Sequence, residues 1–165
     1  MSEAGPSLPV DGRQSERALA IARGTLRLLA LHDFAGLPEV TLSHGRRADI
    51  LALGPKGDVW LIEIKSSLQD YRADEKWSEY LPFCDRFSFA VDPDFPREII
   101  PEAAGLIVAD KYGAEILRES ALPTLPGARR KAITLEFGRV AARRLHGLFD
   151  ANPAAFGPAV AKIPD

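Results

Sequence analysis

Short apolar runs, separated by Gly, Pro and charged residues, recur along the chain and predict buried β-strands. Two neighbouring runs, residues 47–53 and 59–66, stand out because each places ionisable side chains among aliphatic neighbours. The turn sequence Gly-Pro-Lys-Gly-Asp separates them, so we expect the two strands to pair as a hairpin. The predicted strands, in chain order, are 39–42, 47–53, 59–66, 86–91, 105–109 and an edge strand at 114–118.

Helical periodicity predicts the elements between these strands. Ser15 is expected to cap a helix over residues 16–32, whose second half is nearly all apolar and therefore buried. A second helix, over about 70–80, follows a pair of serines that can cap it. One stripe of this second helix carries Arg72, Lys76 and Tyr80, and an adjacent apolar stripe carries Ala73, Trp77 and Leu81.

The last third of the chain predicts a short helix over 95–102, a Pro-rich loop and an amphipathic helix over 129–149. The inward positions of that closing helix are predicted to be Ile133, Phe137, Ala141, Leu145 and Leu148. Between the first two strands, residues 43–46 are expected to form a tight turn in which His44 is a turn residue tolerant of positive φ.

Length and composition fit one compact domain. The chain has 165 residues, of which 46% are hydrophobic, and the domain is predicted to span 13–149. Residues 1–12 and 150–165 are rich in Pro with Gly, Ser or Ala, and are expected to be a disordered and a loose tail. No run is long enough to span a membrane and the N-terminus lacks the order of a signal peptide, so a cytoplasmic location is predicted.

The charge balance limits how nucleic acid could be bound. A formal net charge of −2 is unlike a domain that holds nucleic acid by bulk electrostatics, so any such surface must be local. Candidate basic patches are Arg46-Arg47, the Arg72/Lys76 stripe, Arg129-Arg130-Lys131 and Arg143-Arg144; a solvated face is the alternative for each patch outside the second helix. The single cysteine, Cys84, is interpreted as a small buried hydrophobe and not as a nucleophile.

The two central strands predict a metal site. Successive side chains of a strand alternate between faces, so Glu63 and Lys65 share one face, and hairpin pairing can bring Asp49 beside Glu63. Two adjacent carboxylates repel unless a cation lies between them, and such oxygen donors suit Mg²⁺. The alternative is that Glu63 and Lys65 form a solvated ion pair on an exposed sheet face.

The order of Asp49, a spacer, and then Glu63 and Lys65 at the end of an apolar strand resembles the PD-(D/E)XK nuclease superfamily, with Ala48 where a proline is usual. Further segments resemble the MmcB-like DNA-repair proteins, a bacterial branch of that superfamily, over about residues 20–149. These segments are Glu-Ile-Lys-Ser-Ser, Lys-Trp-x-x-Tyr, Cys-Asp-Arg-Phe at 84–87, Gly-Leu-Ile-Val-Ala-Asp at 105–110 and Leu-His-Gly-Leu at 145–148.

This resemblance implies an α/β fold with a restriction-endonuclease-like αβββαβ core, in which helices flank a mixed central sheet, plus a C-terminal helix. It also implies metal-assisted phosphodiester hydrolysis. Asp49, Glu63 and the backbone carbonyl of Ile64 would hold Mg²⁺ or Mn²⁺, and Lys65 would steady the attacking water or the developing charge. The residues expected to contact or lie near DNA are Arg46, Arg47, Arg72, Lys76 and Tyr80.

Two acids are weighed as additional metal ligands. Glu16 lies in the first turn of the first helix, where the helix dipole already favours an acidic residue. Glu39 lies in the first strand, and a charged residue is common on an edge strand without any role in metal binding. Two functions stay open: a metal-dependent nuclease acting in DNA repair, and a DNA-binding or protein-binding repair accessory that keeps the fold without cleaving. DNA, other repair proteins and a second copy of the chain are the predicted partners.

Overall fold

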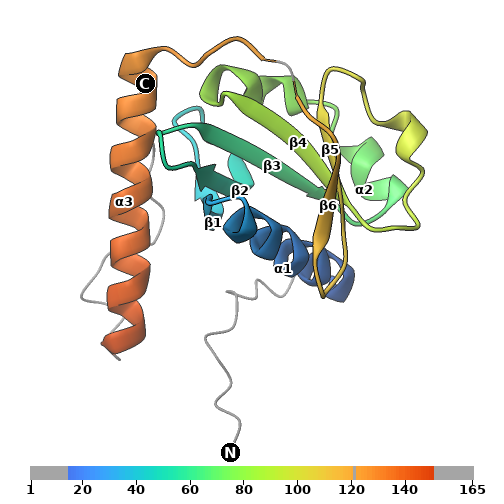
Figure 1. Ribbon diagram of the computed structural model, residues 1–165, viewed down its shortest axis with the longest axis horizontal. Coiled ribbons are helices and arrows are strands. Elements are labelled where there is room, and N and C mark those ends of the chain that lie inside the picture. The colour runs from blue at the N-terminus through green and yellow to red at the C-terminus, as the bar shows by residue number, and fades with distance from the viewer. Residues whose placement is uncertain (1–14, 121, 151–165) are drawn as a thin grey trace, which may run out of the picture.

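The computed structural model describes residues 15–120 and 122–150, which build one mixed six-stranded sheet with helices on both faces (Figure 1). The predicted αβββαβ order, the mixed sheet and the C-terminal helix are confirmed. The predicted tails lie outside the described residues, except for Asp150. The elements are α1 (Glu16–Leu31), β1 (Ala35–Thr41), β2 (Arg47–Leu53), β3 (Val59–Lys65), α2 (Leu68–Ala73), the 3₁₀ helix η1 (Trp77–Phe83), β4 (Arg86–Val91), the 3₁₀ helix η2 (Arg97–Ile99), β5 (Gly105–Ala109), β6 (Ala114–Arg118) and α3 (Gly127–Phe149).

The strands lie in the sheet in chain order, from β1 to β6. The first three strands are antiparallel, β3, β4 and β5 are parallel, and β6 returns antiparallel to β5. The parallel step from β3 to β4 requires a crossover, and α2 with η1 supplies it. This crossover covers the face of β3 that carries the odd-numbered side chains, because Tyr80 and Phe83 of η1 pack in one cluster with Val59 and Leu61.

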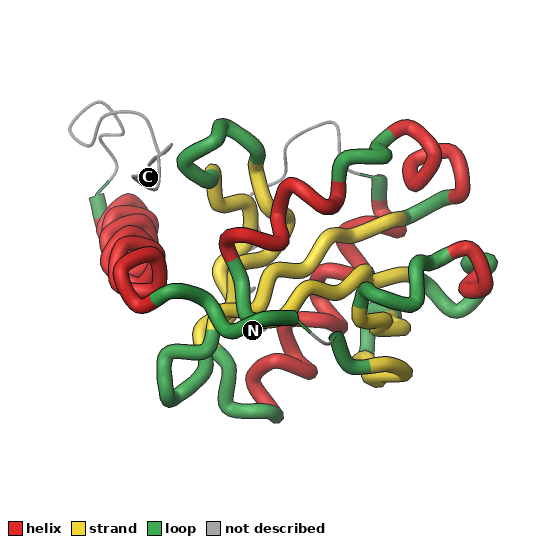
Figure 2. The backbone as a smooth tube through the Cα atoms, turned by 90° about the horizontal axis from the view of Figure 1, so that it is seen from above, coloured by secondary structure: helices red, strands yellow, loops and turns green. Residues whose placement is uncertain are grey.

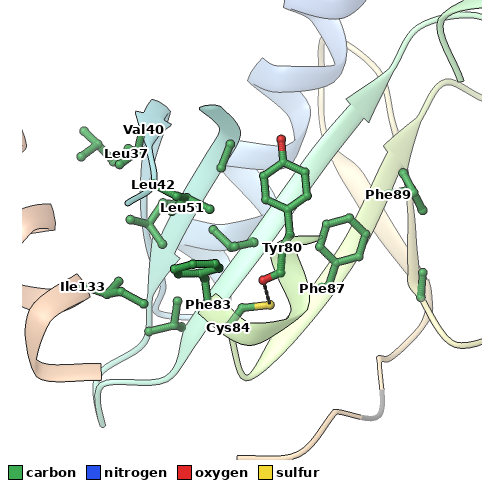
Figure 3. Close-up of a cluster of buried hydrophobic side chains, with 14 of the residues drawn as sticks. Leu37, Val40, Leu42, Leu51, Tyr80, Phe83, Cys84, Phe87, Phe89 and Ile133 are labelled. Atoms are coloured by element: carbon green, nitrogen blue, oxygen red, sulfur yellow. Dashed lines mark hydrogen bonds between the residues drawn. The ribbon is translucent and has the colours of Figure 1, made fainter. Parts of the chain in front are cut away.

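Helical segments lie on both sides of the strands (Figure 2). An apolar cluster on each face packs them against the sheet. On one face α1 buries Ile21, Leu28 and Leu29 against even-numbered positions of β2 and β3. On the other face, η1 and the first turns of α3 cover the odd-numbered positions of β3 and β4. Figure 3 shows this cluster. Its labelled members are Leu37, Val40, Leu42, Leu51, Tyr80, Phe83, Cys84, Phe87, Phe89 and Ile133. Cys84 is buried there, and burial raises the pKa of its thiol to about 12, as expected of a packing residue.

The helix α1 lies unusually close to the β5–β6 turn at Gly24. A side chain at this position would place its Cβ 2.1 Å from the carbonyl oxygen of Asp110 and 2.3 Å from that of Gly113. Real Cβ atoms do not approach backbone oxygens so closely, so the packing of α1 on this face requires glycine.

The first strand begins earlier than predicted, at Ala35 and not at Glu39. It contains Pro38, which lacks an N–H group and is tolerated because β1 is an edge strand. Glu39 has a φ of 53°, which distorts the strand. In the turn that follows, Gly45 and not His44 has the positive φ, at 89°.

The predicted helix over 70–80 is wrong: α2 ends at Ala73 and η1 begins at Trp77. The break lies at Asp74, whose Oδ1 accepts a hydrogen bond from the backbone N–H of Lys76 at 3.2 Å. This local hydrogen bond offers the backbone an alternative to the helix. As a result, the two predicted stripes do not exist as continuous helical rows.

The predicted short helix over 95–102 is reduced to η2, because Pro96 and Pro101 flank it. The closing helix begins at Gly127, two residues before the predicted start. Ile133 is buried, and Phe137 and Ala141 pack against the same cluster, as predicted. Leu145 and Leu148, in the last turns of α3, are instead 56% and 66% exposed, so the predicted inward contacts of these two residues are wrong. These turns lie at the lower end of the helix in Figure 1. None of the helices in residues 15–150 that the structure describes is long and apolar enough to cross a membrane.

Candidate functional site

The candidate site forms where β2 and β3 separate. The last paired residues of this antiparallel ladder are Ile50 and Ile62, so Asp49 and Glu63 stand opposite each other just beyond it. There the two carboxylates replace the missing ladder bonds. The N–H of Ile64 donates to Oδ2 of Asp49 at 2.7 Å, and the N–H of Asp49 donates to Oε1 of Glu63 at 3.3 Å. The strands thus hold two carboxylates side by side, as the hairpin predicted.

Burial makes this pair of carboxylates costly to ionise. Glu63 is only 5% exposed. Burial, followed by the charge of Asp49, raises the pKa of Glu63 to about 8. Burial likewise raises the pKa of Asp49 to about 6, although the hydrogen bond from Ile64 opposes the shift. Without a compensating cation, the site therefore disfavours two negative charges at neutral pH.

Lys65 lies on the same face of β3, and its side chain is only 5% exposed. Its Nζ is 3.2 Å from Oδ2 of Asp74 and 3.9 Å from Oε2 of Glu63. A solvated Glu63–Lys65 pair on an exposed sheet face, the alternative raised from the sequence, is excluded by this burial. Lys65 is a buried cation whose nearest carboxylate belongs to the α2–η1 break.

Arg46, in the β1–β2 turn, closes the rim of the site. Its Nη2 contacts Oδ1 of Asp74 at 2.8 Å and its Nη1 contacts Oε2 of Glu79 at 3.1 Å, while its guanidinium lies 5.0 Å from the centre of the Tyr80 ring. The Tyr80 ring belongs to the apolar cluster, its hydroxyl points out of it (Figure 3), and this hydroxyl donates to the carbonyl of Arg47 at 3.0 Å. Arg46 and Tyr80 therefore lie beside the site, but their polar groups are engaged within the protein.

The remaining predicted site residues are placed differently. Arg72 and Lys76 are exposed, on either side of the break at Asp74. Arg47 is half exposed and pairs with Glu39 at 3.7 Å. Glu16 is exposed in the first turn of α1, and none of the contacts found among the described residues joins it to Asp49 or Glu63.

Two other basic patches proposed from the sequence hold the fold together instead. Arg130 makes a two-pronged ion pair with Asp85, at 2.5 and 2.8 Å. Arg144 donates to the carbonyl of Glu39 at 2.7 Å and to that of Pro38. Both arginines fasten α3 to the sheet, so their charges are committed to structure.

Sequence reasoning missed Asp74 as part of the site. It predicted a continuous helix through this segment, whereas Asp74 ends the helix α2 and directs its carboxylate at Lys65. The residue type at position 74 could have predicted this break. An Asp side chain accepts hydrogen bonds from the backbone N–H two residues further along the chain, and it therefore often ends a helix. Asp70 was missed as well; its Oδ2 accepts from the N–H of Ser66 at 3.1 Å, directly after β3.

The donor set fits a small hard cation. Among the described residues no group of three or more His, Cys, Asp and Glu side chains is arranged to hold a metal ion. Asp49 and Glu63 supply two carboxylates, and Mg²⁺ typically uses one or two carboxylates with water and substrate oxygens. Two neighbouring carboxylates that repel each other are also chemically suited to a divalent cation, because it would offset their repulsion.

Comparisons with known proteins show the family to which the chain belongs. The family model described as "DNA repair protein MmcB-like" matches residues 6–152. Among solved structures, SPO1766, a protein of unknown function from Silicibacter pomeroyi, is 44% identical with a TM-score of 0.80, and the match covers 84% of this chain and 94% of that chain. A second solved structure, that of Pyrococcus furiosus SfsA in complex with Ca²⁺, has 14% sequence identity and a TM-score of 0.31. The match covers 61% of this chain and 60% of that chain. No curated protein matches the chain.

Proposed function

Because this chain belongs to the MmcB-like family of DNA repair proteins, we propose that it is a metal-dependent nuclease that hydrolyses DNA phosphodiester bonds at Asp49, Glu63 and Lys65. The observation that carries the proposal is the juxtaposition at the split between β2 and β3. There each of two carboxylates accepts a hydrogen bond from a backbone N–H of the facing strand, and a buried ammonium lies 3.9 Å from Oε2 of Glu63. Two acids and a lysine on one sheet face match the signature of the nuclease superfamily that the sequence resembles.

Each side chain has a distinct task in this proposal. Asp49 and Glu63, with the carbonyl of Ile64, would hold Mg²⁺ or Mn²⁺. When bound, such an ion supplies Lewis-acid chemistry, which polarises the phosphate and makes a water more acidic. Lys65 would donate hydrogen bonds to the attacking water or to the phosphate oxygens as their negative charge grows. The low exposure of Lys65 strengthens these interactions, because charges attract more strongly away from water.

A second function is favoured by a different observation. Glu63 and Lys65 are buried beneath the contact between Arg46 and Asp74, and Arg130 and Arg144 are used to build the fold. These features suit an accessory protein that binds DNA or another repair protein without cleaving. A homodimer, partnership with other repair proteins, a bacterial origin and a cytoplasmic location stay predictions.

Cleavage assays separate the two functions. Labelled single-stranded, duplex, flapped and branched DNAs should be incubated with the protein and Mg²⁺ or Mn²⁺. We expect the wild type to cleave at least one of them, Asp49→Asn to bind Mn²⁺ more weakly in calorimetry, and Lys65→Ala to keep metal and DNA affinity while its rate falls by about 100-fold or more.

The controls test whether loss of activity is specific. Glu119→Gln alters a surface pair far from these residues in the sequence and should cleave like the wild type. A wild type that binds DNA but cleaves none of the substrates with either metal would select the accessory function. Unchanged Mn²⁺ affinity in both Asp49→Asn and Glu63→Gln would refute the metal site itself.

A further inference from the structure

We propose that Asp74 is a positioning residue that holds the ammonium of Lys65 away from Glu63 and so leaves the Glu63 carboxylate available to the metal ion. The inference rests on the proposed function, because it assigns a new residue to the same site. It is carried by the arrangement of three charged groups on one face of β3. Lys65 lies between two carboxylates, and Asp74 is the nearer one.

Asp74 is fixed independently of Lys65. Its Oδ1 accepts from Nη2 of Arg46 at 2.8 Å and from the backbone N–H of Lys76 at 3.2 Å. These two hydrogen bonds leave Oδ2 directed at Lys65, at 3.2 Å. Although burial alone would raise the pKa of Asp74, the hydrogen bond from Arg46 and the charge of Lys65 lower it, so the carboxylate is negative. The α2–η1 break therefore presents a fixed anion to the lysine.

Removing this anion would leave Lys65 with one carboxylate neighbour. A buried ammonium without a partner is costly, so we expect it to move the short distance that separates it from Glu63. A direct Lys65–Glu63 ion pair would then compete with a divalent cation for the same oxygens. Asp74 limits that competition, because it draws Lys65 to 3.2 Å from its own Oδ2 and holds it at 3.9 Å from Oε2 of Glu63, beyond hydrogen-bond distance.

Glu79 provides a matched control. It contacts the same arginine as Asp74, at 3.1 Å from Nη1 of Arg46, but the described contacts do not join it to Lys65. Asp74→Asn and Glu79→Gln therefore each remove a charge beside Arg46, while only the first removes the charge beside Lys65. A residue that merely anchors Arg46 would give similar results in both variants.

Calorimetric titration with Mn²⁺ tests the competition. We expect Asp74→Asn to bind Mn²⁺ about tenfold more weakly than the wild type, and Glu79→Gln to bind it within about twofold. Lys65→Met removes the competing cation, so the double variant Asp74→Asn/Lys65→Met should bind Mn²⁺ as Lys65→Met does. Asp74→Glu keeps a carboxylate at this position and should bind Mn²⁺ more tightly than Asp74→Asn but more weakly than the wild type. If Asp74→Asn does not fold, Asp74→Ser replaces it, since serine can also accept from the N–H two residues on.

Metal-free crystal structures of the wild type and Asp74→Asn give a second readout that needs neither metal nor activity. We expect Nζ of Lys65 to move into hydrogen-bond distance of Oε2 of Glu63 in the variant. An unmoved Lys65, or equal Mn²⁺ affinities in Asp74→Asn and the wild type, would overturn the inference while leaving the nuclease proposal intact. A wild type that binds no Mn²⁺ would overturn the proposed metal site, and with it the competition inferred here.

Discussion

Glu63 shows at the scale of one residue how the fold forces a functional side chain into an unfavourable place. Its neighbours on β3 are apolar, and its carboxylate is buried beside that of Asp49. Burial raises the pKa of both groups above the values they have in an unfolded chain, so the folded protein holds protons that the unfolded chain releases. Holding these two carboxylates side by side therefore lowers stability at pH values where both ionise, and the proposed cation would offset this loss.

This cost predicts a pH-dependent effect of Glu63→Gln. Because the pKa of Glu63 is raised to about 8, its protonation stabilises the fold fully below the ordinary glutamate value, and this contribution is lost as the pH rises through 8. The glutamine of the variant has no ionisable group, so position 63 of the variant does not contribute this pH dependence. In thermal denaturation with EDTA, we expect its Tm advantage over wild type to be larger at pH 9 than at pH 5, by at least roughly 4 °C.

Asp49→Asn serves as the comparison for that measurement. Its advantage should grow mainly between pH 4 and 6, since the pKa of Asp49 is raised to about 6. A Tm difference between Glu63→Gln and wild type that stays constant from pH 5 to 9 would contradict the raised pKa.

At the scale of elements, the break between α2 and η1 decides which groups reach the site. A continuous helix would align Arg72, Lys76 and Tyr80, but the turn at Asp74 separates them. Tyr80 is buried beside the site, whereas Arg72 and Lys76 stay exposed on the two sides of the break. Only Glu75 separates Lys76 from Asp74, whose carboxylate contacts Lys65. We therefore predict that Lys76 meets DNA phosphates next to the site.

The exposed side chain of Lys76 predicts a change in salt dependence. Lys76→Ala should weaken binding similarly across DNA sequences and reduce the magnitude of the slope of log affinity against log salt by about one unit, because one phosphate contact is lost. Fluorescence anisotropy over a salt series measures both effects. Lys56, in the β2–β3 turn at the far end of these strands, is the control: Lys56→Ala should leave the slope unchanged. Equal slopes for Lys76→Ala and wild type would remove Lys76 from the DNA surface.

At the scale of the whole molecule, α3 is fastened to the sheet by a few polar contacts and a short apolar interface. Asp85, between η1 and β4, accepts from Nη1 and Nη2 of Arg130 at 2.5 and 2.8 Å. It also accepts from the backbone N–H groups of Val59 and Leu125, both at 2.8 Å. Burial alone would raise the pKa of Asp85, but the bonds from Arg130 and the backbone outweigh it and lower the pKa to about 2. One carboxylate thus ties together β3, the loop before α3 and α3 itself.

This arrangement predicts that Asp85→Asn destabilises the protein by about 3 kcal/mol, because Arg130 is left without its anion. Urea unfolding at pH 7 measures the loss. Since the pKa is lowered, the wild-type advantage is present above about pH 4 and should disappear as the pH falls toward 2. Glu119→Gln removes an exposed partner of Arg86 and should change stability by less than about 0.5 kcal/mol. Similar losses of unfolding free energy in Asp85→Asn and Glu119→Gln would show that Asp85 does not anchor α3 to the sheet.

The sequence by itself determined the strands that follow the first one and the pairing of Asp49 with Glu63, whereas it placed the start of the first strand four residues too late. Period-two alternation and the Gly-Pro-Lys-Gly-Asp turn are local, and together they set which side chains share a face and which residues stand opposite each other. The order of the elements followed for the same reason, since each apolar run was bounded by residues that end it.

Only the tertiary structure decided what surrounds those residues. The burial of Lys65, the approach of Asp74 and the engagement of Arg46, Arg130 and Arg144 all depend on contacts between segments distant in sequence. The exposure of Leu145 and Leu148 is of the same kind, because an amphipathic pattern shows which face of a helix is apolar but not how far the sheet extends beneath it. Local periodicity fixes direction along a strand or helix, whereas long-range packing fixes what each side chain meets.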